Sequence, residues 1–99
     1  MARFGVYKNP DGEGWLLDVQ ADLLSHLNSR VVVPLLPLNC APKPIETLNP
    51  VFDIEGVSAS LVTQYMAAVP VQMLKHKLLT LESHRNEITA ALDLLFQGF

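Results

Sequence analysis

The 99-residue sequence is long enough for one domain and too short for two separate hydrophobic cores. Apolar residues make up 49% of it, charged residues make up 17%, and the formal net charge is −3. This composition predicts an ordered globular domain over residues 1–99 and excludes an intrinsically disordered chain.

Short strand-like segments separated by turns fill most of the sequence. The alternating run at 3–7 and the run at 15–19 flank the turn-forming segment "NPDGEG", which together predict a β-hairpin. Runs rich in β-branched and other apolar residues predict further strands at 30–34, 51–55, 59–62 and 69–74. The pattern indicates a small antiparallel sheet.

A proline-rich segment interrupts this series of strands. It contains Pro34, Pro37, Pro42, Pro44 and Pro50. Because proline has no N–H to donate, a central strand cannot contain so many of them. We therefore predict a loop or a small excursion at the edge of the sheet over about residues 36–50.

The periodicity becomes helical from Ser83 onward, which predicts a C-terminal helix over about residues 83–97. Ser83 is the expected N-cap, and Gly98 suits a left-handed C-cap. The spacing assigns to one core-facing stripe Ile88, Ala91, Leu92 and Leu95.

The end of this helix also carries residues that lie away from the stripe. At 100° per residue, Asp93 and Gln97 lie opposite it, with Leu94 near them and Phe96 on its flank. Phe99 follows the glycine cap. These residues could fold back on the sheet as the contact that often follows a glycine cap, or they could form an exposed recognition surface.

No catalytic or metal-binding constellation is recognisable. His26, His76 and His84 do not have the spacing of zinc ligands with one another or with Cys40, and no glycine-rich phosphate loop is present. We therefore predict no catalytic residue, no metal and no cofactor.

Two polar segments allow alternative interpretations. The basic run Lys75–Lys77 could touch phosphate, but in an acidic chain it reads more simply as a solvated strand end. The segment 82–87 could supply an acid, a base and a cation for RNA cleavage. At a helix start, the same residues are more simply explained as cap and dipole partners.

Nothing in the sequence supports secretion or a membrane role. The single cysteine cannot close an intramolecular disulfide, and the first residues do not resemble a signal peptide. No apolar run approaches the roughly 20 residues that a membrane-spanning helix needs. We therefore expect a cytoplasmic protein.

Four segments resemble the CcdB toxins of bacterial toxin–antitoxin modules in their order and spacing. They are "LLDVQADLL", "RVVVPL", "MAAVPV" and "SHRNEITAALDLLFQGF", at 16–24, 30–35, 66–71 and 83–99. The resemblance implies a mainly β fold with one C-terminal α-helix. Its twisted, SH3-like antiparallel sheet would have about five strands and a small β wing from the proline-rich segment, and the protein would be a homodimer.

The resemblance also implies a function. Members of this family bind the GyrA subunit of DNA gyrase and trap the enzyme on cleaved DNA, so they are protein inhibitors and not enzymes. They serve plasmid maintenance, are neutralised by a CcdA-type antitoxin, and meet DNA only through the autoregulatory antitoxin complex. By position, the gyrase-binding residues would be Leu23, Leu24, Asp93, Phe96, Gln97, Gly98 and Phe99.

The chain departs from the best-known form of the motif at two of these positions. Gln97 replaces a tryptophan that stacks on an arginine of gyrase, and Asp93 replaces an asparagine. Losing a cation–π contact costs roughly 0.5–2 kcal/mol, although Asp93 and Gln97 could instead hydrogen-bond a guanidinium. Two alternatives therefore stay open: an endoribonuclease toxin of the MazF/Kid type, and a non-toxic relative that has lost gyrase binding.

Overall fold

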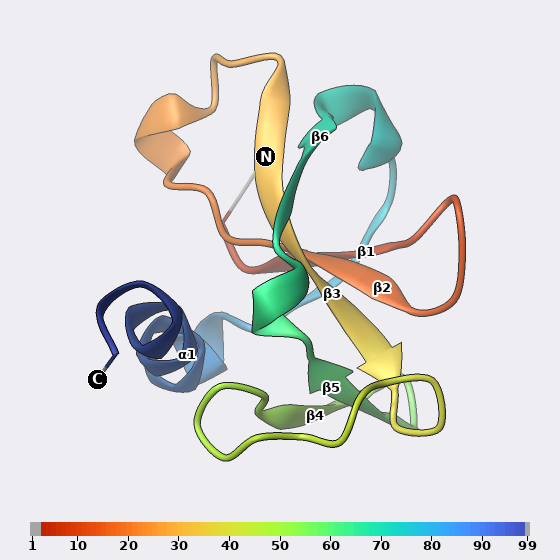
Figure 1. Ribbon diagram of the computed structural model, residues 1–99. Coiled ribbons are helices and arrows are strands. Elements are labelled where there is room, and N and C mark those ends of the chain that lie inside the picture. Colours follow the sequence, from red (N-terminus) through yellow and green to blue (C-terminus); the bar gives the residue numbers. More distant parts are fainter. Residues whose placement is uncertain (1–2, 99) are drawn as a thin grey trace.

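The structure is a computed structural model that describes residues 3–98. Its fold is mainly β with one C-terminal helix (Figure 1), which confirms the predicted fold class. The strands are β1 (Gly5–Lys8), β2 (Trp15–Asp18), β3 (Ser29–Pro37), β4 (Val51–Ile54), β5 (Val57–Leu61), β6 (Ala67–Pro70) and β7 (Lys77–Thr80). The helix α1 spans Arg85–Gln97, and short 3-10 turns lie at η1 (Asp22–Leu24), η2 (Thr63–Tyr65), η3 (Val71–Met73) and η4 (Glu82–His84).

The strands form one curled antiparallel sheet around β3. The order is β4-β5-β3-β2-β1-β7, and β6 also pairs with β3. One edge of β3 pairs with β2, whereas the other edge is shared between β6 at Ser29–Val32 and β5 at Leu35–Pro37. The chain turns through η2 between these two partners, so the sheet bends around β3 (Figure 1).

The hairpin of β4 and β5 is closed by a two-residue turn. Ile54 pairs with Val57, which leaves Glu55 and Gly56 at the tip with φ of 52° and 85°. Positive φ at both positions is the signature of a type I′ turn, whose twist matches that of the flanking strands. The Gly56 N–H also donates to Asp53 Oδ1 at 2.8 Å.

Three segments differ from the sequence-based expectation. In the segment 36–50, expected to form a wing, only residues 36 and 37 lie in a strand, and the remainder is turn and irregular backbone. The strand predicted at 69–74 ends at Pro70, where the chain enters η3 and the Val71 N–H bonds to the Asn28 carbonyl at 2.9 Å. β7 is an additional strand, because its residues pair with the distant β1.

Two hydrophobic clusters lie on opposite faces of the sheet. The larger one includes Trp15, Leu17 and Val33 from the sheet and Ile88 from α1. The smaller one includes Tyr7, Leu16, Val32 and Leu74. Neighbouring residues of a strand point to opposite faces, so β2 is buried on both sides.

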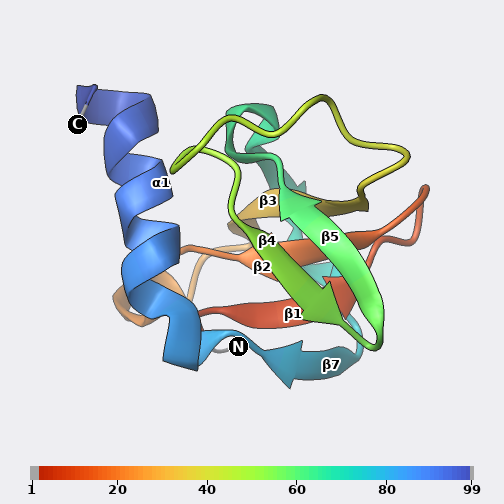
Figure 2. The ribbon, with the colours of Figure 1, turned by 90° about the horizontal axis from the view of Figure 1, so that it is seen from below.

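The helix packs along the sheet by the predicted stripe, with one exception (Figure 2). Ile88 and Ala91 are fully buried, and Leu92 packs against the core. Leu95 was expected in the core but is 36% exposed. The prediction was wrong there because α1 begins beside β7 and its last turn has run past the sheet (Figure 2).

The two ends of α1 also differ from one another. Ser83 is not the N-cap: it lies in η4, and His84 stands at the cap position without a side-chain cap bond. The C-cap prediction is confirmed, since Gly98 has φ of 81° and its N–H donates to the Leu94 carbonyl at 3.0 Å. Only glycine adopts this conformation without strain.

Candidate functional site

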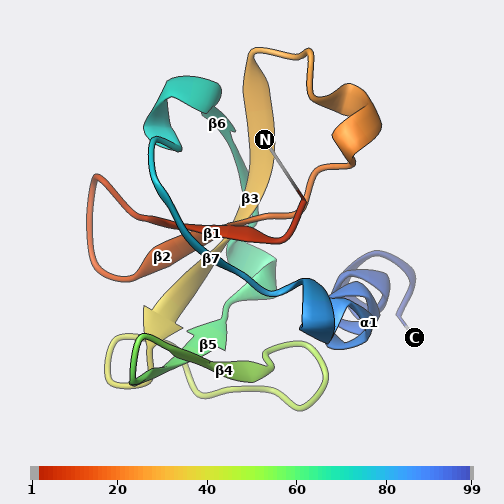
Figure 3. The ribbon, with the colours of Figure 1, turned by 180° about the vertical axis from the view of Figure 1, so that it is seen from behind.

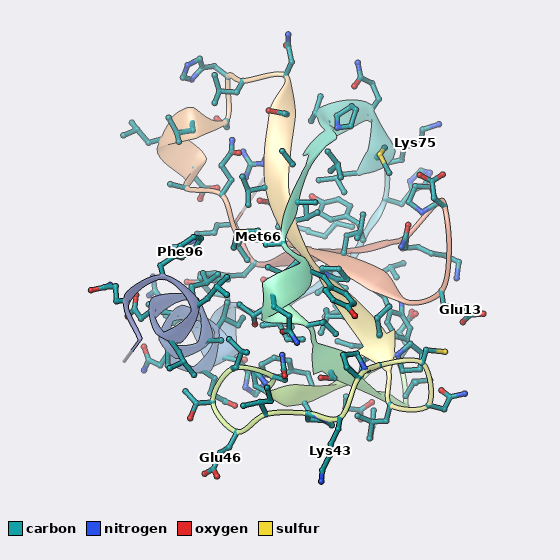
Figure 4. All side chains as sticks on the ribbon, in the orientation of Figure 1. Glu13, Lys43, Glu46, Met66, Lys75 and Phe96 are labelled. Carbon is teal, nitrogen blue, oxygen red and sulfur yellow. The ribbon has the colours of Figure 1, made fainter. Side chains whose placement is uncertain are left out.

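The last turn of α1 presents an aromatic side chain to solvent. Phe96 is 70% exposed, and it lies on the side of α1 that faces η1 (Figure 4). Gln97 and Gly98 are also exposed, whereas Asp93 is half-buried. A large apolar side chain exposed to solvent is typical of a protein-binding site when others lie near it.

Asp93 and Gln97 are joined on the surface of α1. The Gln97 Nε2 donates to Asp93 Oδ1 at 3.4 Å, one helical turn apart. The last turn of α1 contains no basic residue, so the carboxylate adds to the negative end of the helix dipole. This end of the helix is therefore suited to a cationic partner group.

A second exposed apolar group lies on η1 and just after it. Leu23 is 87% exposed, and Leu24 and Leu27 are each 42% exposed. The views from the front and from behind both place η1 and α1 on the same side of the molecule (Figures 1 and 3). The structure therefore brings six of the seven site residues predicted by resemblance to one side, as two patches, and Phe99 lies outside the described residues.

A buried ion pair lies at the base of η1. Arg30 of β3 donates from Nε to Asp18 Oδ2 at 2.9 Å, its Nη2 lies 2.7 Å from the same oxygen, and both side chains are buried. Burial raises the pKa of the Asp18 carboxyl, against the opposing effects of the Arg30 bonds and charge. Burial and the charge of Asp18 also raise the pKa of the nearby Tyr7 hydroxyl. This pair joins β2 to β3 where η1 leaves the sheet.

A groove of about 760 Å³ is lined by residues of the β1–β2 turn and of the η3–β7 connection. Figure 3 shows these two segments on the other side of the molecule from η1 and α1. Lys8, Asp11, Lys75 and His76 are among the residues that line the groove. Sequence reasoning missed this grouping, because it joins the basic run Lys75–Lys77 to a lysine from the other end of the chain. A smaller hollow of about 280 Å³ lies between α1 and the loop before β4.

The polar residues before and within α1 form local pairs. His84 Nδ1 lies 3.1 Å from Glu87 Oε1, and Arg85 Nη2 lies 3.4 Å from Glu82 Oε1. All four side chains are exposed. They therefore form local i,i+3 pairs. Neither η4 nor α1 has a side-chain cap bond, and of these residues only Glu82 and Glu87 have the charge that favours a helix N-terminus.

Within residues 3–98, no group of three or more histidine, cysteine, aspartate or glutamate residues is placed to hold a metal ion. No helix in the described part of the chain is long and apolar enough to cross a membrane.

These features define a small β domain whose C-terminal helix and η1 turn expose apolar side chains on one side. A family model described as CcdB protein matches residues 3–98 of the 99-residue chain. The chain therefore belongs to the CcdB family, which confirms the resemblance found in the sequence. The family comprises toxins of toxin–antitoxin systems that act on DNA gyrase and are inhibitors of that enzyme.

Proposed function

We propose that this protein is the toxin of a type II toxin–antitoxin system. It binds the GyrA subunit of DNA gyrase as a homodimer, traps the complex of gyrase with cleaved DNA, and is neutralised by a CcdA-type antitoxin. The contact residues are Leu23, Leu24, Asp93, Phe96, Gln97, Gly98 and Phe99. The observation that carries the proposal is the exposure of Phe96 and Leu23 on one side of a chain that belongs to the CcdB family.

The two exposed patches suit this role physically. Burying a large apolar side chain that was fully exposed contributes about 1.5–3 kcal/mol, and Phe96 and Leu23 both retain most of their surface for a partner. A twofold-symmetric dimer would present each patch twice to a target that is itself twofold symmetric. Two weak contacts on one target then reinforce each other through the high effective concentration of the second.

Asp93 and Gln97 supply polar recognition where the family motif has an aromatic ring. Asp93 lies three residues before Phe96 on α1, so the two side chains are neighbours on the helix, and Gln97 donates a weak 3.4 Å bond to the carboxylate. A carboxylate accepts two parallel hydrogen bonds from a guanidinium, and such charge-assisted bonds are about twice as strong as neutral ones. An arginine of the target therefore finds an acceptor here instead of a stacking surface.

The test is a gyrase cleavage assay with purified enzyme, ATP and supercoiled plasmid. The wild type is compared with Phe96→Ala, with Leu23→Ala and with a variant that lacks Phe99. Leu38→Ala is the matched control, because Leu38 is 46% exposed but follows β3 in the other loop. We expect linear DNA on denaturation with the wild type and with Leu38→Ala, and much less with the other three. Equal cleavage by all five proteins would rule out this contact surface.

The groove favours one second candidate, the endoribonuclease. It brings Lys8 and Lys75 together with His76 and Asp11, and an RNA-cleaving site needs cations for phosphate and an acid–base pair. Digestion of total RNA in parallel with the gyrase assay separates the two candidates. RNA cleavage that is lost in His76→Ala, without linear DNA, would favour the ribonuclease. A protein with neither activity would be a relative that has lost gyrase binding.

A further inference from the structure

The segment that carries Leu23 and Leu24 has no side chain in the hydrophobic core. Residues 21–29 are exposed throughout, and we call this stretch the η1 loop. Loops without buried anchors are among the least ordered parts of a protein. Polar contacts must therefore hold the backbone of the η1 loop if its two leucines are to be presented in one arrangement.

The side chain of Gln20 supplies these contacts. Its Nε2 donates hydrogen bonds to the carbonyl oxygens of Leu24 at 3.1 Å and Ser29 at 3.3 Å. Its Oε1 accepts a hydrogen bond from the Val31 N–H at 3.1 Å. Both hydrogens of the amide and its oxygen are thus occupied, and one side chain joins the η1 turn to the far end of the loop.

Gln20 is itself held by backbone hydrogen bonds to the buried ion pair. The residue is 8% exposed, its N–H donates to Asp18 Oδ1 at 3.0 Å, and its carbonyl accepts from Arg30 Nη2 at 3.3 Å. Asp18 and Arg30 are the buried ion pair that joins β2 to β3. Gln20 therefore connects the sheet to the η1 loop, whose own residues are all exposed.

The loop has two further tethers. Near its end the Val71 N–H donates to the Asn28 carbonyl at 2.9 Å, and at its start Arg3 holds Asp22. The Arg3 N–H donates to Asp22 Oδ1 at 2.8 Å, and the Arg3 Nε donates to the Val19 carbonyl at 3.0 Å. These bonds hold Asp22, which precedes the leucines, but they do not reach the later part of the loop. The carbonyl of Leu24 itself is held by Gln20 and by the Leu27 N–H at 3.1 Å.

We propose that Gln20 is a positioning residue for the gyrase-contacting surface, which fixes the arrangement of Leu23 and Leu24 without touching the target. This inference rests on the proposed function. It also explains the "DVQ" segment of the sequence, since Asp18 pairs with Arg30, Val19 packs in the core and Gln20 closes the loop.

The test uses Gln20→Met, which preserves the length of the side chain and removes its three hydrogen bonds. We expect binding to GyrA to weaken about tenfold, because lost side-chain hydrogen bonds let the loop leave its binding arrangement. Amide hydrogen exchange should accelerate at Leu24, Ser25 and Leu27, whose N–H groups bond within the loop. If Gln20→Met does not fold, Gln20→Glu replaces it, because the carboxylate keeps the acceptor for Val31 and loses both donations.

Asn49→Leu is the matched control. Asn49 is also a buried amide that holds a loop, since its Oδ1 accepts from the Ile45 N–H at 3.0 Å and its Nδ2 donates to the Leu61 carbonyl at 3.0 Å. That loop carries none of the proposed contact residues. We expect Asn49→Leu to destabilise the protein and leave GyrA binding unchanged, so general destabilisation cannot account for a loss that is seen only with Gln20→Met.

A double-mutant cycle with Leu23→Ala decides whether Gln20 acts through the leucines. Adding Gln20→Met to Leu23→Ala should weaken binding less than it does in the wild type. Equal losses in both backgrounds, or wild-type binding by Gln20→Met, would overturn the inference and leave the proposed function standing if Leu23→Ala still binds poorly. Wild-type binding by both Leu23→Ala and Phe96→Ala would overturn the proposed function and the role of Gln20 with it.

Discussion

A buried amide side chain makes several hydrogen bonds to each of two long loops of this protein, yet the two loops differ in what they expose. Gln20 holds the η1 loop, and Asn49 holds the loop between β3 and β4. The η1 loop keeps residues 21–29 in solvent, whereas the other returns to the core through half-buried Leu48 and buried Asn49. A buried amide thus holds a loop with exposed side chains in one case, and attaches the loop to the core in the other.

The difference lies in what supports each amide. The backbone of Gln20 bonds to Asp18, which pairs with Arg30 inside the sheet, so the groups that support Gln20 are polar and buried. Asn49 bonds to the Leu61 carbonyl and to Gln64 Oε1 at 2.8 Å, beside the main core. Because polar groups support the η1 loop, none of its leucines is needed as an apolar anchor. They therefore remain available for a partner.

Of the substitutions that test this difference between the loops, Asp18→Asn should lower the free energy of unfolding most. It removes the buried negative charge next to the η1 loop. Arg30 would stay buried with its counter-ion gone, and breaking a buried pair in this way typically costs 3–5 kcal/mol, so we expect a loss of about that size. Urea denaturation measures the change in the free energy of unfolding. Asp22→Asn is the control, because Asp22 is exposed and lies 4.0 Å from Arg30, where a pair contributes about 1 kcal/mol or less. Similar losses for both variants would contradict a special role of the buried pair.

Asn49→Leu should have a smaller effect, confined to stability. It removes hydrogen bonds to Ile45, Leu61 and Gln64 near the core, and leaving buried polar groups unpaired costs about 1–3 kcal/mol. Thermal denaturation checks the loss, and the gyrase cleavage assay below the melting temperature checks that activity remains. Reduced cleavage by a folded Asn49→Leu protein would show that the second loop also contributes to the contact surface.

Local patterns were enough to predict the parts of the fold that local physics decides. The run that became β3 is β-branched, β2 was predicted as the hairpin partner of β1 across a turn segment, and the spacing of Ile88, Ala91 and Leu92 identified the buried face of α1. β7 was not recognised as a strand, because it is mostly exposed and its pairing with β1 includes a shift of register. Leu95 satisfies the helical period, but it is 36% exposed, because the last turn of α1 extends beyond the sheet (Figure 2).

The candidate site was less accessible to sequence reasoning. The helical period alone indicated that Asp93, Phe96 and Gln97 lie away from the core stripe of α1. Leu23 and Leu24 came only from the family resemblance, since nothing in the local pattern separates an exposed leucine such as Leu23 from a buried one. The role inferred for Gln20 depends on partners at Leu24, Ser29 and Val31, which only the folded loop brings around one amide. In the same way, the groove joins Lys8 to Lys75 across most of the chain.

The smallest expected change is in the affinity of the exposed surface for GyrA. Gln97→Trp places an aromatic ring beside Phe96, and a cation–π contact with an arginine of the target would add roughly 0.5–2 kcal/mol to binding, about two- to thirtyfold in affinity. Breaking the exposed bond to Asp93 should cost little, because its 3.4 Å length and its exposure make it weak. Titration of GyrA with each protein measures the gain.

Asn86→Trp is the control for that measurement, because Asn86 is exposed in the first turn of α1, at the opposite end from Phe96. A similar gain in both variants would mean that added hydrophobicity alone improves binding. If Gln97→Trp does not bind GyrA more tightly while Phe96→Ala still binds poorly, we infer that the target group next to residue 97 contacts the Asp93 carboxylate. The arginine would then be held by hydrogen bonds, and Asp93→Asn should weaken binding where Gln97→Trp fails to strengthen it.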